Sequence, residues 1–135
     1  MSAFSDYLED KIGDSVFRGA TFPTIANIYV GLSSAAPTEA GTFNELANTG
    51  AYARVTVAAS TAQWGALAAD VSNVNAITFP TATADWASAT HFFLADSATY
   101  NAGNLLYYAA LTTARTVTNG GTASFAAGEL DVNHL

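Results

Sequence analysis

The sequence is short of charged side chains. Only 11% of its 135 residues are Asp, Glu, Lys or Arg, whereas 50% are apolar. A typical soluble domain carries roughly a quarter charged residues, and a free monomer with so few would be poorly protected against association with its neighbours. We therefore interpret the chain as one component of a larger assembly, in which much of its outer surface faces other protein.

Cysteine and basic residues are also scarce. The chain has no cysteine, which excludes disulfides and thiolate metal sites. A net charge of −7 and so few basic residues cannot build the positive stripe that nucleic-acid binding requires, and they disfavour anionic membrane surfaces. We predict neither nucleic acid nor membrane as a partner. The basic residues are Lys11, Arg18, Arg54 and Arg115.

Long apolar runs are missing as well. No segment approaches the roughly 20 consecutive apolar residues of a membrane helix. Residues 1–6 show neither the positive nor the apolar region of a signal peptide. The chain is therefore expected to stay in the cytoplasm in which it is made until it is assembled.

A length of 135 residues predicts a single domain spanning residues 1–135. Its first part, residues 3–18, has the spacing of an amphipathic helix, with Ser2 or Ser5 as the N-cap and Gly19 as the stop signal. We expect the apolar stripe of this helix to pack on a sheet or on a neighbouring subunit. The stripe consists of Phe4, Leu8, Ile12 and Val16.

The remainder, residues 25–135, reads as short strand-like runs separated by turns. We expect a mainly β fold, either a β-sandwich or a jelly-roll-like small barrel of about 7–8 strands, with one N-terminal amphipathic helix. The sequence Asn119-Gly120-Gly121 is typical of a hairpin turn. The expected strands are residues 25–32, 52–58, 75–79, 89–96, 105–111, 122–125 and 130–132, with residues 63–67 as a short strand or a turn.

Two pairs of adjacent aromatic residues, Phe92-Phe93 and Tyr107-Tyr108, lie within expected strands. Neighbouring residues of a strand point to opposite faces of the sheet. Both faces must therefore have apolar or semi-apolar cover. One face is the core, and the other is expected to be covered by the helix or by another subunit.

Few residues suggest catalysis. His91 follows Asp85 by six positions, and a His–carboxylate pair can orient a general base or a ligand. We favour a partly buried histidine that bonds to backbone or threonine, because no companion nucleophile is apparent. The oxygen-rich turn at residues 96–104 could hold a hard cation, but Asx-turn hydrogen bonds explain it better. We predict no catalytic, cofactor-binding or metal-binding residue and no enzyme activity, with a glycan hydrolase as the weakest alternative.

Arg54 is expected to be structural. It lies mid-strand between Tyr52 and Thr56, where an unpaired charge would be costly. We expect a carboxylate partner on an adjacent strand or subunit, which would fix the register of the two. The alternative is an exposed arginine lying across Tyr52.

Short motifs spread over nearly the whole chain carry a resemblance. In order they are Asp6-Tyr7-Leu8-Glu9, Ile28-Tyr29-Val30-Gly31-Leu32, Ala36-Pro37-Thr38, Gly50-Ala51-Tyr52-Ala53-Arg54, Ile77-Thr78-Phe79-Pro80, Ala84-Asp85-Trp86, Thr90-His91-Phe92, Gly103-Asn104-Leu105-Leu106-Tyr107-Tyr108 and Phe125-Ala126-Ala127-Gly128. Together they resemble a family of small tailed-bacteriophage virion structural proteins, often labelled tail-fibre-like. The resemblance implies a non-enzymatic virion component that is assembled in the host cytoplasm.

Our leading hypothesis is a capsid decoration or cement protein that bridges neighbouring shell subunits. The alternative is a tail-fibre or baseplate-associated structural module involved in host attachment. The expected partners are other virion proteins, either the major capsid protein or tail proteins, and further copies of the chain in a homo-oligomer, with a trimer as the first expectation. The candidate interface residues are Phe4, Leu8, Ile12, Arg54, Phe92, Tyr107 and Tyr108.

Overall fold

The computed structural model describes residues 3–68 and 70–133, which form one helix and nine strands. In chain order these are β1 (Ala3–Phe4), α1 (Asp6–Arg18), β2 (Asn27–Ser33), β3 (Val55–Ala58), β4 (Asp70–Ser72), β5 (Ile77–Thr78), β6 (Ala89–Ala95), β7 (Leu105–Arg115), β8 (Ser124–Phe125) and β9 (Asp131–Asn133). The expected class, mainly β with one N-terminal helix, is confirmed. The helix has neither the length nor the hydropathy to cross a membrane, and it is the one helix of the described residues.

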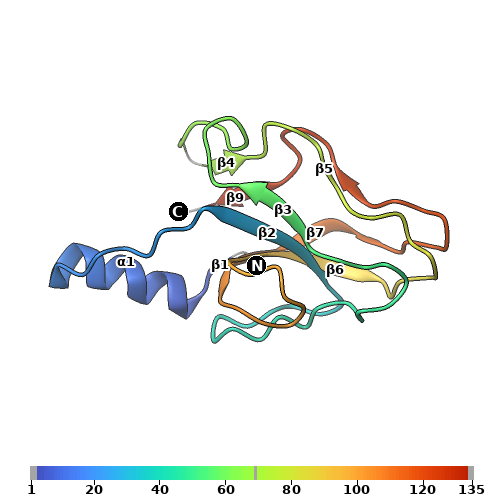
Figure 1. Cartoon of the computed structure of the whole chain (residues 1–135), viewed down its shortest axis with the longest axis horizontal. Coiled ribbons are helices and arrows are strands. Elements are labelled where there is room, and N and C mark those ends of the chain that lie inside the picture. Colours follow the sequence, from blue (N-terminus) through green and yellow to red (C-terminus); the bar gives the residue numbers. More distant parts are fainter. Residues whose placement is uncertain (1–2, 69, 134–135) are drawn as a thin grey trace.

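One five-stranded sheet forms the centre of the molecule (Figure 1). Its strands follow the order β1-β7-β6-β2-β3, and every neighbouring pair is antiparallel. Two smaller antiparallel sheets, β4-β9 and β5-β8, lie beside it. Within the described residues no sheet closes, because a barrel needs its first and last strands to pair and the outer strands β1 and β3 do not. The barrel expectation was therefore wrong.

The helix begins later than its apolar spacing predicts. Residues 3–4 are not helical but pair with β7 as β1. The helix starts at Asp6, with Ser5 as its N-cap, while Ser2 lies outside the described residues. Strand pairing with β7 replaces helix formation at the start of the chain. The Ser5 N–H donates to the Leu106 carbonyl (3.0 Å), so the sheet contact extends up to the N-cap residue.

The hairpin expectation for residues 119–121 was also wrong. A turn is present, with Gly120 at φ +84°, where glycine carries no Cβ penalty. It joins β7 to β8, but β8 pairs with β5 rather than with β7. The turn instead docks on another loop, since the Gly120 N–H donates to the Ala82 carbonyl (2.7 Å) and the Ala82 N–H donates to the Gly121 carbonyl (2.9 Å).

The other strand expectations hold in part. Residues 63–67 form no strand, and Trp64 makes a single bridge to Asn73. Strand β4 was not expected, because its few residues carry no clear alternation. Strand β7 runs four residues past the predicted end at Leu111, to Arg115.

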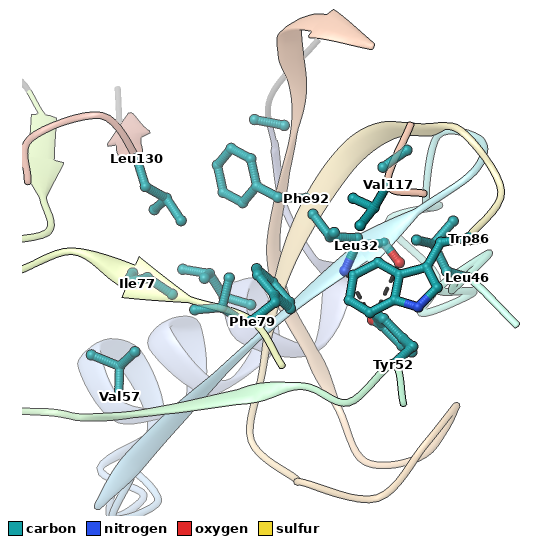
Figure 2. Packing of buried hydrophobic residues seen from close by; sticks show 14 of the residues in the cluster. Leu32, Leu46, Tyr52, Val57, Ile77, Phe79, Trp86, Phe92, Val117 and Leu130 are labelled. Atoms are coloured by element: carbon teal, nitrogen blue, oxygen red, sulfur yellow. Dashed lines mark hydrogen bonds between the residues drawn. The ribbon is translucent and has the colours of Figure 1, made fainter. Parts of the chain in front are cut away.

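The main apolar core joins the five-stranded sheet to the β5-β8 sheet. Phe125 of β8 packs edge-on against Phe92 of β6, with ring centres 5.7 Å apart. Figure 2 shows Leu32, Tyr52 and Trp86 gathered at one end of this core, and Ile77 and Leu130 at the other. Aromatic rings supply much of its volume, which fits the large apolar area that such side chains bury.

The opposite face of the five-stranded sheet is covered by a loop. Phe93 is fully buried there in a second cluster, and Phe43, from the loop between β2 and β3, lies on it with ring centres 5.0 Å apart. The prediction of cover on both faces is confirmed. The predicted source of the second cover was wrong, because Phe43 of the chain's own loop occupies the place expected for the helix or another subunit.

Candidate functional site

Helix α1 is held to the rest of the molecule at its first turn. Ser5 is fully buried. Its hydroxyl donates to the carbonyl of Leu105 and accepts from the N–H of Leu8 (3.2 Å), which is the N-cap bond. At the other end, Gly19 adopts φ +71° and closes the helix in the left-handed conformation.

Beyond this first turn, the helix and the segment that follows it project from one end of the molecule (Figure 1). We call α1 together with residues 19–26 the arm. No residue of α1 is buried. The apolar side chains of its last turn face solvent: Val16 is 67% exposed and Phe17 is 86% exposed. Ile12 and Phe22 are the other large apolar side chains exposed on the arm.

A groove of about 550 Å³ lies at the far end of β7. Its walls are the last residues of β7 and the segment around β8, and Phe92 and Phe125 line it from the core. The register of β6 with β7 passes from His91↔Ala110 to Ala89↔Arg115. Residues 111–114 therefore bulge out of the sheet, which opens the groove on that side.

A buried ion pair within the loop between β2 and β3 also binds the loop between β6 and β7, beside the five-stranded sheet. The Arg54 guanidinium donates to both carboxylate oxygens of Glu45, at 2.9 Å from Nε and 2.8 Å from Nη2. The two side chains are 1% and 0% exposed. Arg54 Nη1 also donates to the carbonyls of Ser97 and Ala102, at 2.7 and 3.0 Å. The expectation of a structural arginine with a carboxylate partner is confirmed, whereas the exposed alternative was wrong. The expected location was also wrong, because Arg54 precedes β3 and Glu45 lies in the same loop between β2 and β3 rather than on an adjacent strand or subunit.

The Glu45 carboxylate accepts two further hydrogen bonds. It accepts from the Tyr52 hydroxyl (2.9 Å) and from the Asn101 N–H (2.7 Å). Burial, and after it the Glu45 charge, raises the pKa of Tyr52 well above its usual value of 10.0, so the phenol stays protonated and keeps donating. A buried charge with every lone pair bonded is stable where a half-bonded one is not.

Two aromatic rings, which also contact each other, lie close to the guanidinium. Arg54 Cζ lies 4.6 Å from the centre of Phe43 and 4.9 Å from the centre of Phe93, which adds cation–π attraction in a desolvated site. Phe93 reaches this position by crossing β2 at Gly31, where an added Cβ would lie 2.1 Å from Phe93 Cζ. The Phe93 ring thus has two roles: it contacts the Arg54 guanidinium, and it leaves no room for a side chain at position 31.

The structure divides the predicted interface residues into two groups. Phe92, Tyr107 and Tyr108 are buried within the chain's own core. Phe4 and Leu8 are partly buried at the base of the arm, where Phe4 packs edge-on against Tyr107 with ring centres 5.9 Å apart. The remaining two are Arg54, which is buried in its ion pair, and Ile12, which is exposed on the arm. Contact of any of them with a partner stays a prediction.

The residues considered for chemistry do not converge. His91 Nδ1 bonds to the Thr90 hydroxyl (2.8 Å), and burial lowers its pKa. Asp85 bonds elsewhere, since it accepts from the Asn119 N–H (2.8 Å). The favoured reading of His91, bonded to a threonine, is confirmed.

The oxygen-rich turn at residues 96–104 is closed by its own side chains. Both Asp96 carboxylate oxygens accept from Asn104, one from the backbone N–H (2.7 Å) and one from the amide (2.8 Å). The part of the chain that the structure describes holds no group of three or more His, Cys, Asp or Glu side chains placed to bind a metal ion.

Sequence reasoning missed Glu45, Phe43 and the groove. Glu45 and Phe43 belong to the long loop between β2 and β3, and no local spacing predicts which residues of that loop contact Arg54 or Phe93. The groove depends on a bulge in β7, for which the sequence offers one signal: the threonine-rich run at residues 112–116 interrupts the apolar strand. Polar residues at consecutive positions are typical of a strand segment that bulges away from its sheet into solvent.

Comparison with protein families identifies a match over nearly the whole chain. Residues 3–133 match the family model described as Podophage GP4 fiber I protein gp80. The match spans the helix, all of the described strands and both loops of the Arg54–Glu45 cluster. A search of curated proteins finds no match.

Proposed function

The chain belongs to the podophage GP4 fiber I protein family, and from that premise we propose that it is a fibre module that takes part in attachment of the virion to its host. The family makes the protein a non-enzymatic structural component of the virion's tail fibre, associated with other tail and fibre proteins. The match over residues 3–133 is the observation that carries the proposal.

The capsid decoration hypothesis was wrong, because the family is one of fibre proteins. The two observations behind that hypothesis, the paired aromatics and the low charge, also have another explanation. The paired aromatics, for which cover by the helix or another subunit was expected, are buried by the chain's own loop and core. Low charge indicates protein contacts, but it cannot distinguish a capsid surface from a fibre.

Two further proposals concern the form of the protein. We propose one domain over residues 1–135 with sandwich-like layering, supported by an apolar cluster that includes residues from β2 to β9 and by the Phe92–Phe125 contact between sheets.

We also propose that the protein is a homo-oligomer, with a trimer as the first expectation. The exposed Val16 and Phe17 support association, since adjacent large apolar side chains on a projecting arm gain from burial.

Competition for adsorption tests the attachment role. Host cells are incubated with the purified protein, and the rate at which phage then adsorbs is measured. Occupation of host sites by the protein should slow adsorption in a dose-dependent manner, with an unrelated acidic protein as the control. If adsorption is unaffected, and phage lacking this protein adsorbs normally, attachment is excluded while membership of the fibre stands.

A further inference from the structure

The sequence has one Asn-Gly pair, Asn119-Gly120, which lies in the segment between β7 and β8. Both residues are exposed. In a flexible chain such a pair is chemically labile, because glycine has no Cβ to hinder approach to its nitrogen. Solvent reaches the pair, so only its conformation can prevent the reaction.

The reaction of such a pair is deamidation. The Gly120 nitrogen attacks Cγ of Asn119 and forms a succinimide ring, while the bond from Cγ to the side-chain nitrogen breaks. The proton that the Gly120 nitrogen gives up leaves with the side-chain nitrogen as ammonia. A water molecule then opens the ring at either carbonyl, which produces aspartate or isoaspartate at position 119. The isoaspartate product lengthens the main chain by one carbon atom.

Residues 118–121 form a turn, here called the Asn-Gly turn, that holds the pair in an unreactive conformation. The Gly121 N–H donates to the Thr118 carbonyl (2.8 Å). Gly120 has φ +84°, whereas φ of Asn119 is negative. This combination is a type II turn, in which ψ of the residue before the glycine is about +120°. Ring closure requires a ψ of about −120°, the value of the mirror-image type II′ turn, because Cβ of Asn119 must eclipse the attacking nitrogen.

Hydrogen bonds to a neighbouring loop keep this turn from rotating. The Gly120 N–H donates to the Ala82 carbonyl (2.7 Å), and the Ala82 N–H donates to the Gly121 carbonyl (2.9 Å). Asp85 adds a third bond, since its Oδ1 accepts from the Asn119 N–H (2.8 Å). The nitrogen that would attack therefore belongs to a peptide group that can rotate only after its bond to Ala82 breaks.

We propose that Asn119 is a deamidation site that reacts only when the Asn-Gly turn leaves Ala82 and Asp85. Local opening of this kind has its own free energy, which is smaller than that of global unfolding. The reaction makes the opening permanent, because isoaspartate changes the spacing of the main chain and either product adds a carboxylate near Asp85. This property belongs to the chain itself and is independent of host attachment.

Opening of the Asn-Gly turn also affects the main core. The Trp86 N–H donates to the Val117 carbonyl (2.8 Å). Both side chains are buried, and Figure 2 shows them at the same end of the core. Trp86 packs edge-on against Tyr52, with ring centres 5.4 Å apart. Protein deamidated at Asn119 should therefore melt at a lower temperature than unmodified protein.

Peptide mapping by mass spectrometry tests the proposal, because deamidation changes the mass of the peptide that contains Asn119. Wild-type protein is incubated at neutral pH, both folded and in enough urea to unfold it. Samples are then digested at acidic pH, where deamidation is slow. The deamidated and unmodified fractions of folded protein are separated by charge, and their melting temperatures are compared.

Three folded variants are incubated beside the wild type. Asp85→Ala removes the acceptor of the Asn119 N–H, whereas Asp85→Asn keeps an acceptor oxygen without the charge. The matched control, Asp131→Ala, removes an exposed hydrogen bond from the Ser72 hydroxyl (2.6 Å) and leaves the Asn-Gly turn intact. Positions 85 and 131 are both exposed, and circular dichroism verifies that each variant is folded.

The expected result is deamidation of Asn119 at least about tenfold slower in the folded wild type than in the unfolded chain. Asp85→Ala should react several-fold faster than the folded wild type, because the turn opens more often. Asp85→Asn and Asp131→Ala should react at the rate of the folded wild type.

Equal rates in the folded and the unfolded wild type would overturn the proposal, because the turn would then give no protection. This comparison decides even if Asp85→Ala does not fold. A folded Asp85→Ala that reacts as slowly as wild type would contradict the role of the bonds to the loop. If Asp131→Ala reacts as fast as Asp85→Ala, general loosening of the chain is responsible instead. Equal melting temperatures of the two fractions would exclude permanent opening.

Discussion

The arm and the Arg54–Glu45 cluster depart in opposite ways from the usual partition of polar and apolar side chains. The cluster places a charged pair in the interior, with side chains 1% and 0% exposed. The arm places Phe17 in solvent at 86% exposure. The cluster meets its hydrogen-bonding needs within the chain, whereas the arm leaves its apolar surface to be covered from outside.

The comparison separates stability from association. Free energy of unfolding should depend strongly on residues of the cluster, because removing a partner leaves an uncompensated buried charge. Changes at the end of the arm should leave that free energy almost unchanged, because exposed positions contribute little to it. Four predictions follow this contrast from the largest expected effect to the smallest.

Arg54→Met should lower the free energy of unfolding by about 3–5 kcal/mol, because Glu45 would stay buried without its cation. Urea denaturation measures the change. The matched control is Arg18→Met, whose side chain is 80% exposed in its 3.5 Å contact with Asp14, and this variant should stay within about 0.5 kcal/mol of wild type. Equal free energies of unfolding for the two variants would show that the Arg54–Glu45 cluster contributes no more to stability than the exposed end of the arm.

Gly31→Ala should cost about 3 kcal/mol. The new Cβ would lie 2.1 Å from Phe93 Cζ, and that ring is fully buried between β2 and Phe43, so it cannot move aside without disturbing the core. Thermal denaturation gives the change in midpoint. A variant that melts like wild type would mean that the ring is free to relocate.

Leu8→Asp and Val16→Asp compare the base of the arm with its end. Leu8 packs against the core, so its replacement by a carboxylate should lower the free energy of unfolding by about 2 kcal/mol. Val16→Asp should change it by less than about 0.5 kcal/mol. Denaturation at a protein concentration low enough to give monomers makes the comparison. Similar losses for both variants would show that the end of the arm is packed in the monomer.

Gly13→Ala should be stabilising by about 0.5–1 kcal/mol. Gly13 lies inside α1, where an added Cβ meets no atom within 4 Å, and alanine is the better helix former. The same substitution thus has opposite signs at Gly31 in the body and Gly13 in the arm. Loss of stability in Gly13→Ala, measured by the same melts, would indicate an unseen contact on that side of the helix.

The amino-acid sequence by itself determined the local elements with the strongest signals. Period 3.6 with Ser5 and Gly19 at its ends predicts α1 to within three residues of its start. Apolar runs predict β2, β6 and most of β7. The same local logic predicts a buried partner for Arg54, because a charge in a strand-like run must be compensated wherever it lies.

Only the tertiary structure decided which elements meet. Residues 3–4 have helical spacing, yet they form β1 because β7 offers an unpaired edge. The pairing of β8 with β5, the bonds of Arg54 to the carbonyls of Ser97 and Ala102, and the position of Phe43 on Phe93 are contacts between segments far apart in the chain. A local pattern reports the period and burial of one segment, but long-range partners follow from how all segments pack together. For the same reason the exposure of Ile12, Val16 and Phe17 on the arm was visible only in the folded structure.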